Sequence, residues 1–241
     1  MIFRSPSVLD EVTEVFSIRD DIFLYFLRSH RRVNVPIDLR GGYEKILIPL
    51  KGSVKFSELH VYEKDVLYLP STISRVNLEV ANGSIIYVLG ARVNESSAPA
   101  HSHYVKRLVD AECVDVGDAL SRRRRCTLVR EEDPSHRIIA GYTSCSPYSW
   151  GSFPPHRHDD KYEVFVYFDV DPGFGVQLVF SEDGEESYIV KNYDVVLVSK
   201  GYHPNISLSP SGLKYLWVMV AKKGIRKNSN LSIHPLFARK H

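Results

Sequence analysis

The sequence has few cysteines, three in 241 residues, and none of them forms a closely spaced pair. Cys113, Cys126 and Cys145 are an odd and widely separated set, which is a poor basis for a disulfide framework, so we expect free thiols in a reducing compartment. The N-terminus carries no apolar run of signal-peptide length, and no stretch approaches the roughly 18 apolar residues of a membrane span. These absences predict a cytoplasmic protein without a membrane partner.

The chain also lacks an excess of charge of either sign. Lys and Arg together number 31 against 29 Asp and Glu, a formal net charge of +2. This balance gives no electrostatic reason to expect a nucleic-acid partner. The basic run Arg122–Arg125 is more typical of a solvated face. What the sequence does contain is 44% hydrophobic residues, enough for a buried core and too many for a disordered chain.

Long segments with a helical period are absent, whereas short apolar runs recur along the whole chain. Each run is rich in Val, Ile, Leu, Tyr and Phe and is bounded by Gly, Pro, Asn, Asp or Ser, as in strands separated by turns. The pattern predicts an all-β sandwich or barrel. The expected strands cover Ile22–Phe26, Lys45–Leu50, Val66–Pro70, Ser84–Leu89, Tyr162–Phe168, Val176–Phe180, Asp194–Ser199 and Leu213–Val220.

An internal repeat divides these strands into two halves. The segment Asp65–Ser74 aligns with Asp194–His203, and the same offset, kept without gaps, places Gly83 on Gly212. Self-similarity of this kind is the signature of two similar lobes, and the linker-like stretch Asn94–Ala100 lies between them. We therefore predict an N-terminal lobe over residues 1–100, a connecting segment over 101–130 and a C-terminal lobe over 131–241.

Candidate metal ligands gather in the C-terminal half. His156 and His158 are two residues apart, so their rings project from one face of an extended strand. The turn-tolerant residues Asp159–Lys161 would bring Glu163 back beside them on the neighbouring strand. His203 supplies a fourth donor between a strand end and a proline. Three imidazoles and a carboxylate suit zinc, manganese, iron, nickel or copper, and donor type alone does not choose between these ions.

These motifs resemble the cupin superfamily, whose first motif carries HxH and a Glu and whose second carries a His after a Gly. More narrowly, Ser149–Asp159 and Gly201–Pro204 are similar to 5-deoxy-glucuronate isomerases, and His156–Phe168 resembles 5-keto-4-deoxyuronate isomerases. The resemblance implies a bicupin of two jelly-roll β-barrel lobes. It also implies aldose–ketose isomerisation of a uronate-type sugar acid, as in inositol catabolism. One divalent metal, zinc in the best-known members and with manganese or iron as alternatives, would be held by His156, His158, Glu163 and His203.

The repeat predicts what the N-terminal lobe holds at the same positions. Projecting the four ligands back by the repeat offset gives Leu27, Ser29, Asn34 and Ser74. Leucine cannot bind a metal, and two serines with an amide make a poor ligand set. We therefore expect the N-terminal lobe to be a degenerate cupin lobe without metal ligands.

An aldose–ketose isomerisation removes a proton from the carbon beside a carbonyl, and a divalent metal stabilises the resulting negative charge as a Lewis acid. Glu163 is not free to act as the base if it binds the metal. The candidate proton carriers are Tyr167, on the same strand face as Glu163, and Tyr202, beside the last ligand, with Gln177 able only to orient. A hydroxide on the metal is an equal alternative.

The carboxylate of such a substrate needs a cation. Arg157, Lys161 and Lys200 flank the ligand motifs, and their spacing does not rank them.

Two other functions fit the same ligand set. One is a non-enzymatic metal-binding cupin that senses or binds a sugar acid, and the other is an iron dioxygenase, which the Gly-Tyr-His-Pro match disfavours. We also expect a homo-oligomer, because edge strands of cupin lobes pair between subunits. His136, His234 and the pair His101 and His103 are not expected to be ligands; the pair has no carboxylate at the spacing of Glu163.

Overall fold

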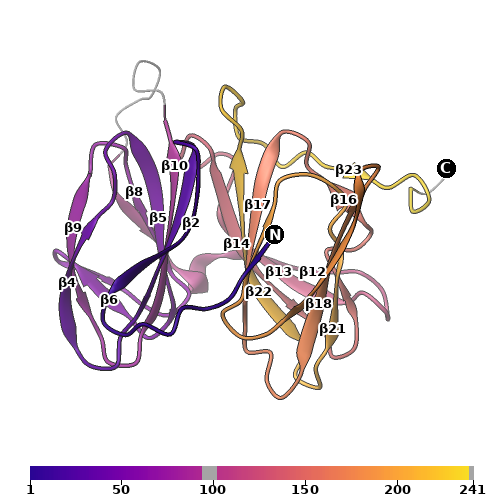
Figure 1. Ribbon diagram of the computed structural model, residues 1–241, viewed down its shortest axis with the longest axis horizontal. Coiled ribbons are helices and arrows are strands. Elements are labelled where there is room, and N and C mark those ends of the chain that lie inside the picture. Colours follow the sequence, from indigo (N-terminus) through magenta and orange to yellow (C-terminus); the bar gives the residue numbers. More distant parts are fainter. Residues whose placement is uncertain (94–101, 239–241) are drawn as a thin grey trace. The chain divides into compact units, whose positions relative to one another are not determined.

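The computed structural model describes residues 1–93 and 102–238, so the linker-like stretch Asn94–Ala100 and His101 lie outside the described residues. Strands dominate this part of the chain, which has no α-helix, and a 3-10 turn covers Leu108–Asp110 (Figure 1). The all-β prediction is confirmed. No helix among the described residues has the length and apolar character needed to cross a membrane.

The chain folds into two compact units, named here the N-terminal and the C-terminal lobe. The N-terminal lobe comprises Pro6–Ala111 and Leu128–Ile138. The C-terminal lobe comprises Met1–Ser5, Glu112–Thr127 and Ile139–His241. The first few residues therefore belong to the C-terminal lobe, where β1 adds to the edge of a sheet by pairing with β20.

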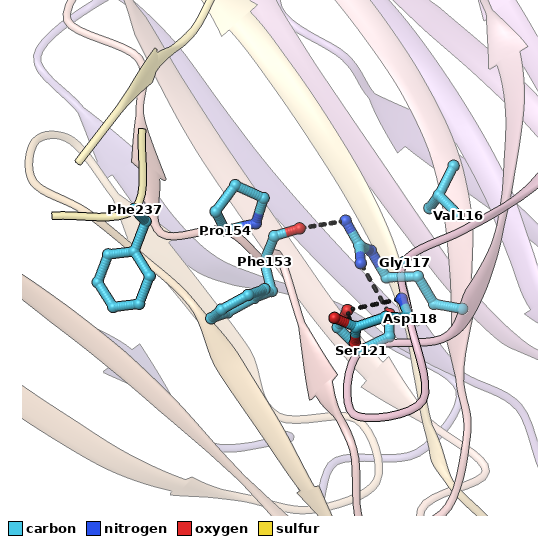
Figure 2. A pocket seen from close by; sticks show the side chains of 8 residues that line it. Val116, Gly117, Asp118, Ser121, Phe153, Pro154 and Phe237 are labelled. Atoms are coloured by element: carbon cyan, nitrogen blue, oxygen red, sulfur yellow. Dashed lines mark hydrogen bonds between the residues drawn. The ribbon is translucent and has the colours of Figure 1, made fainter. Parts of the chain in front are cut away.

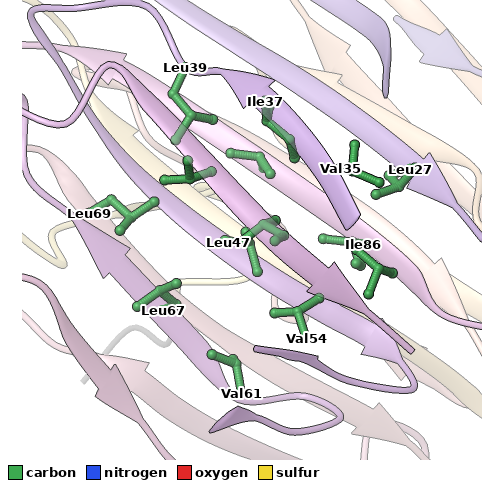
Figure 3. Packing of buried hydrophobic residues seen from close by; sticks show 14 residues of the cluster. Leu27, Val35, Ile37, Leu39, Leu47, Val54, Val61, Leu67, Leu69 and Ile86 are labelled. Carbon is green, nitrogen blue, oxygen red and sulfur yellow. The ribbon is translucent and has the colours of Figure 1, made fainter. Parts of the chain in front are cut away.

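Two sheets form the N-terminal lobe, one of six strands in the order β11-β8-β5-β10-β3-β2 and one of four in the order β4-β9-β6-β7. Aliphatic side chains from both sheets, among them Leu47, Val54 and Ile86, fill the space between them (Figure 3). The strands are β2 (Val12–Ile18), β3 (Ile22–Arg28), β4 (Val33–Asp38), β5 (Tyr43–Lys51), β6 (Val54–Phe56), β7 (Leu59–Val61), β8 (Val66–Leu69), β9 (Arg75–Val80), β10 (Ile85–Arg92) and β11 (Tyr104–Lys106).

The C-terminal lobe has a seven-stranded sheet in the order β1-β20-β17-β22-β14-β13-β12, a four-stranded sheet in the order β15-β21-β18-β19 and the pair β16-β23. Aromatic residues such as Phe165, Tyr215 and Trp217 dominate its core. The strands are β1 (Ile2–Phe3), β12 (Glu112–Val116), β13 (Arg123–Val129), β14 (Ile138–Cys145), β15 (Trp150–Gly151), β16 (His156–Arg157), β17 (Lys161–Phe168), β18 (Phe174–Ser181), β19 (Gly184–Val190), β20 (Val195–Val198), β21 (Asn205–Leu208), β22 (Leu213–Ala221) and β23 (Ser232–Ile233).

Strand register confirms the repeat offset in the second half of each lobe. In the first half, the offset that relates the metal ligands to residues of the N-terminal lobe is different. Lys45 pairs with Leu69 and Gly90 in the N-terminal lobe, and Glu163 pairs with Val198 and Met219, which stand at the repeat-equivalent positions. The counterpart of Glu163 is therefore Lys45. The projection onto Asn34 is wrong, because the hairpin β18–β19 is longer than its counterpart β6–β7 and shifts the offset.

The expectation of free thiols is wrong for two of the three cysteines. Cys113 and Cys126 face each other across the antiparallel strands β12 and β13, with 4.0 Å between their Cα atoms, and they form a disulfide. Directly opposed residues of an antiparallel pair come this close, although they are far apart in sequence. Cys145 is a free, buried thiol, and burial raises its pKa to about 12.

Candidate metal centre

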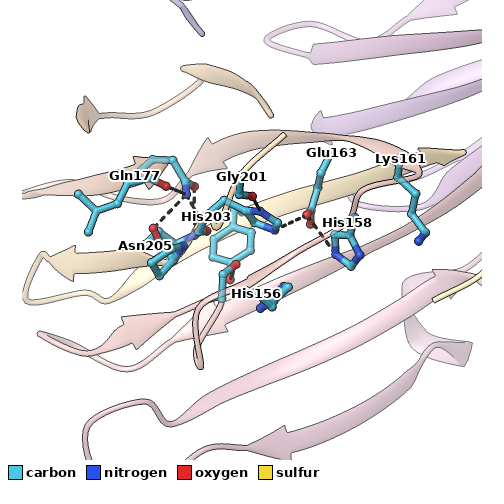
Figure 4. A network of polar contacts seen from close by, with 12 residues as sticks. His156, His158, Lys161, Glu163, Gln177, Gly201, His203 and Asn205 are labelled. Atoms are coloured by element: carbon cyan, nitrogen blue, oxygen red, sulfur yellow. Dashed lines mark hydrogen bonds and ion pairs between the residues drawn. The ribbon is translucent and has the colours of Figure 1, made fainter. Parts of the chain in front are cut away.

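The four predicted ligands come together in the C-terminal lobe (Figure 4). His156 lies in the short strand β16, His158 just after it, and Glu163 points inward from β17 on the same face as the core residue Phe165. The backbone N–H of His203 donates to the carbonyl of His156 at 3.2 Å, which ties the last ligand to the first. The ligand atoms of the three histidines all lie within 4.8 Å of one another, so they form a cluster that could hold a metal ion.

Each imidazole is oriented by a backbone carbonyl at its Nδ1 atom. The Nδ1 atoms of His156, His158 and His203 lie 2.9, 2.7 and 3.0 Å from carbonyl oxygens. The acceptors belong to Pro154, Asn230 and Gly201 respectively. Because a carbonyl can only accept, each Nδ1 carries a proton, and Nε2 is the ring nitrogen left for a metal. Such contacts commonly fix the tautomer and ring orientation of metal-binding histidines.

Two buried polar atoms at the centre of the cluster fit a cation. Glu163 Oε2 lies 2.8 Å from His203 Nε2 and 3.6 Å from His158 Nε2. Glu163 Oε2 and His203 Nε2 are both buried, yet neither has a partner with hydrogen-bond geometry among the described residues. A buried carboxylate oxygen and a buried imidazole nitrogen left in this way are costly unless something binds both. The residues present therefore suit a divalent ion.

Electrostatics prepares the same atoms for metal binding. Burial, together with the charge of His203, lowers the pKa of His156 to about 4, and burial also lowers the pKa of His158. Burial alone would raise the pKa of Glu163, but His203, His158 and His156 together outweigh it and hold that pKa at about 2. The Glu163 carboxylate in turn raises the pKa of His203. At neutral pH the site thus offers an ionised carboxylate and two neutral imidazoles, the protonation states that metal ligation requires.

The C-terminal segment that follows β22 secures the HxH motif. Strand β23 pairs with β16, placing Ile233 opposite His156. The Asn230 carbonyl accepts from His158 Nδ1 and, at 3.0 Å, from Lys161 Nζ. The backbone N–H of His234 donates to the Pro155 carbonyl at 2.8 Å. Sequence reasoning missed this role, since Asn230 acts through its backbone and so leaves no side-chain signal.

Two of the predicted catalytic residues, Tyr167 and Gln177, form a fully buried network beneath His203. The Tyr167 hydroxyl donates to Gln177 Oε1 at 2.5 Å, and burial raises the pKa of that hydroxyl well above its usual range. The Gln177 amide donates to the His203 carbonyl at 2.8 Å and the Pro204 carbonyl at 3.0 Å. Asn205 completes the network at 3.4 Å from Gln177 Oε1. These contacts hold the backbone that carries His203.

The third, Tyr202, is half-buried and surrounded by rings. Its ring centroid lies 4.6 Å from that of His234 and 5.5 Å from that of Phe180. The Arg157 guanidinium lies over the same ring at 5.3 Å. Tyr202 is thus the predicted proton carrier that retains access to solvent beside the last ligand.

The three predicted substrate cations differ in their surroundings. Lys161 is buried, and its ammonium lies 2.6 Å from Asp160. Lys200 is exposed and pairs with Asp183 at 2.6 Å. Arg157 lies near Tyr202, with its Nε atom 3.2 Å from Asp159. Arg157 thus lies against the Tyr202 ring, whereas Lys161 shares the Asn230 carbonyl with His158 Nδ1.

Comparisons with known proteins show which family the chain belongs to. The sequence model of the KduI/IolB family matches residues 36–235. A 5-deoxy-glucuronate isomerase from Geobacillus kaustophilus is 36% identical over 121 residues, which cover 44% of each protein. A 4-deoxy-L-threo-5-hexosulose-uronate ketol-isomerase from Cereibacter sphaeroides is 30% identical over 162 residues, 64% of this chain and 56% of that protein. The matched part of the chain thus spans about half the length of these relatives.

A solved structure extends the similarity to the whole fold. The crystal structure of an IolB-like protein from Salmonella typhimurium superposes with a TM-score of 0.80 at 18% identity and covers 95% of both chains. At 18% identity this similarity shows the fold alone. It confirms the predicted bicupin architecture.

Proposed function

Because the chain belongs to the KduI/IolB family, we propose that it is a metal-dependent aldose–ketose isomerase acting on 5-deoxy-glucuronate or a related keto-deoxy uronate. The observation that carries this proposal is the cluster of three oriented imidazoles, two of which lie against the buried Glu163 carboxylate. Two relatives that carry isomerase names, one for each substrate type, support the reaction class. The matched part of the chain spans about half the length of each relative, so the identity of the substrate is a proposal.

The ligands would be His156, His158, Glu163 and His203, and zinc is the ion we propose. A divalent ion held there supplies Lewis-acid stabilisation of the negative charge that develops when the substrate loses its proton. The protein's part is orientation. Three carbonyls aim the imidazoles, and the Gln177 amide holds the backbone of His203, so the site is built before substrate arrives.

We assign the proton transfer to Tyr202. The reaction moves a proton between adjacent carbons, so the carrier must reach the substrate from a solvent-accessible position beside the metal. Tyr202 is half-buried and directly precedes His203, whereas Tyr167 and Gln177 are sealed in the barrel. We therefore assign Tyr167 and Gln177 to positioning. A conservative Tyr202→Phe change should lower kcat while metal content stays unchanged.

Proton NMR of 5-deoxy-glucuronate in heavy water tests the function directly, with protein stripped of metal and then reloaded with zinc or manganese. The proposal predicts conversion to the ketose only after reloading, with deuterium in the product if the proton exchanges with solvent. The keto-deoxy uronate is the second substrate in the same assay. A fully loaded protein that converts neither compound would contradict the enzyme and favour a metal-binding cupin that senses a sugar acid.

A further inference from the structure

A cavity of about 500 Å³ lies in the C-terminal lobe outside the metal ligands (Figure 2). The turn between β12 and β13, including Asp118, forms one side of it. Phe153 and Pro154, which lead into β16, form another, and Phe237 of the C-terminal segment contributes its ring. The lining is thus a mixture of aromatic surface and polar groups, the composition expected of a small-molecule site.

Arg123 at the wall of this cavity is fixed by backbone contacts and can bind an anion. Its guanidinium donates to the Ser121 carbonyl at 2.8 Å and to the Phe153 carbonyl at 2.5 Å. No carboxylate in residues 1–93 or 102–238 forms an ion pair with it. Asp118 lines the same cavity, but its carboxylate accepts from the Ser121 hydroxyl and the Leu120 N–H. A guanidinium has five N–H donors, so Arg123 retains donors for a bidentate contact.

The cavity and the metal centre share one piece of backbone. The Phe153 carbonyl accepts from Arg123, and the next carbonyl, that of Pro154, accepts from His156 Nδ1. The C-terminal segment also reaches both places, because Phe237 packs on Phe153 with ring centroids 5.6 Å apart and Asn230 orients His158. The wall of the cavity and the HxH motif are therefore connected through the two consecutive carbonyls of Phe153 and Pro154.

We propose that this cavity binds the carboxylate end of a sugar acid, with Arg123 as its cation and the rings of Phe153 and Phe237 against the apolar face of the sugar. The assignment rests on the proposed function, since it names the acid-binding part of the same site. Arg123 suits this role better than the three cations predicted from the sequence, because Arg157, Lys161 and Lys200 each already have a carboxylate partner.

Isothermal titration calorimetry on the zinc-loaded full chain tests the proposal, with D-glucuronate as the acid and D-glucuronamide as its uncharged counterpart. Glucuronate should bind at least 10-fold more tightly than the amide. Arg123→Gln should abolish this preference by weakening glucuronate binding at least 10-fold. The matched control is Arg124→Gln, because Arg124 is the adjacent residue of β13, is exposed and lies 4.0 Å from Asp115, and its loss should change affinity less than twofold.

A second variant keeps the proposal testable if Arg123→Gln does not fold. Asp118→Asn removes the negative charge at the cavity wall and leaves Arg123 in place, so glucuronate should bind about threefold more tightly. The proposal is overturned if wild-type protein binds no glucuronate at millimolar concentration, or binds acid and amide equally. It is also overturned if Asp118→Asn leaves the affinity unchanged, or if Arg123→Gln loses zinc, since Arg123 would then only support the loop that carries His156.

The isomerase assay separates failure of this inference from failure of the proposed function. Turnover by the wild type with an unchanged KM in Arg123→Gln would overturn the cavity assignment and leave the isomerase in place. Arg123-dependent glucuronate binding by a protein that converts neither uronate would support the cavity and contradict the isomerase.

Discussion

The two lobes place opposite charges at the same barrel position. Glu163 in the C-terminal lobe and Lys45 in the N-terminal lobe pair with equivalent residues of the two neighbouring strands, so their side chains enter equivalent spaces. Glu163 is surrounded by three imidazoles. The Lys45 ammonium donates to the carbonyls of Ile73 and, at 3.5 Å, of Pro70. One lobe thus presents a buried anion beside imidazoles, and the other a buried cation beside backbone acceptors.

The same barrel position can therefore hold either charge, provided that the surrounding groups match it. Burial lowers the pKa of Lys45 to about 8, although Asp38 and Glu44 act in the opposite direction. The N-terminal lobe therefore supplies a positive charge from its own chain at the place where, on our proposal, the C-terminal lobe binds a metal ion. A buried charge needs a partner in either case, and only the C-terminal lobe leaves that partner to be supplied from solution.

The largest expected effect comes from removing a ligand in the C-terminal lobe. His156→Ala, His203→Ala or Glu163→Gln should reduce bound metal from one ion per chain to near zero and turnover by at least 10³-fold, because each removes a donor that the site cannot replace. Metal analysis after dialysis and far-UV circular dichroism measure content and fold. Ser74→Ala, the repeat counterpart of the His203 change, should alter neither quantity. Full metal content in a His156→Ala/His203→Ala double variant would refute the ligand assignment.

The reciprocal change in the N-terminal lobe should affect stability and leave metal content unchanged. Lys45→Glu puts a carboxylate against the carbonyls of Ile73 and Pro70 with no imidazoles beside it, so we expect a loss of about 3–5 kcal/mol in the free energy of unfolding. Urea unfolding followed by fluorescence measures this loss. Lys45→Met is the matched control and should cost less, since it buries no unpaired charge. Equal stability of Lys45→Glu and Lys45→Met would mean that a carboxylate at this position carries no penalty for an unpaired buried charge.

The pH dependence of stability sharpens the same comparison. The folded-state pKa of Lys45, about 8, lies below the ordinary value of 10.5, so between these values the unfolded chain binds more protons. Stability therefore rises with pH across this window, by on the order of 3 kcal/mol for this group. The measurement is the difference in unfolding free energy between wild type and Lys45→Met from pH 7 to 10.5. A difference that stays constant would show that Lys45 keeps its ordinary pKa.

The smallest effect concerns the segments that follow the last large strand of each lobe. In the N-terminal lobe the chain returns as β11 to pair with β8, whereas in the C-terminal lobe β23 pairs with the ligand strand β16. A chain ending at Lys227 retains all four ligands but loses the Asn230 carbonyl, so metal affinity should fall 10- to 100-fold. Competition with a chelator measures it. A chain that lacks only Arg239–His241 is the control, and equal affinity of the two truncated chains would assign no role to β23.

The strands, the repeat and the HxH pair could be predicted from the sequence, because they depend on the type and spacing of side chains. Short apolar runs bounded by turn residues predicted the strands, the matched glycines Gly83 and Gly212 marked the repeat, and the HxH spacing predicted that two imidazoles share a face. The structure confirms the all-β bicupin fold and brings the four expected side chains together. The strands and the HxH pair depend on residues close in the chain, whose geometry follows from the period of a strand, whereas the repeat follows from comparing the two halves of the sequence.

Only the tertiary structure decided which distant residues meet. Because the hairpin β18–β19 is longer than β6–β7, the offset between the two lobes changes along the chain. The residue opposite Leu69 is therefore Lys45, whereas Asn34 lies in another strand. The pairing of β12 with β13 joins Cys113 to Cys126. The contact between Asn230 and His158 runs through a backbone carbonyl, a group that every residue possesses. Side-chain type therefore determined what chemistry this protein can offer, whereas strand register and backbone contacts, which no local pattern encodes, determined where that chemistry is assembled.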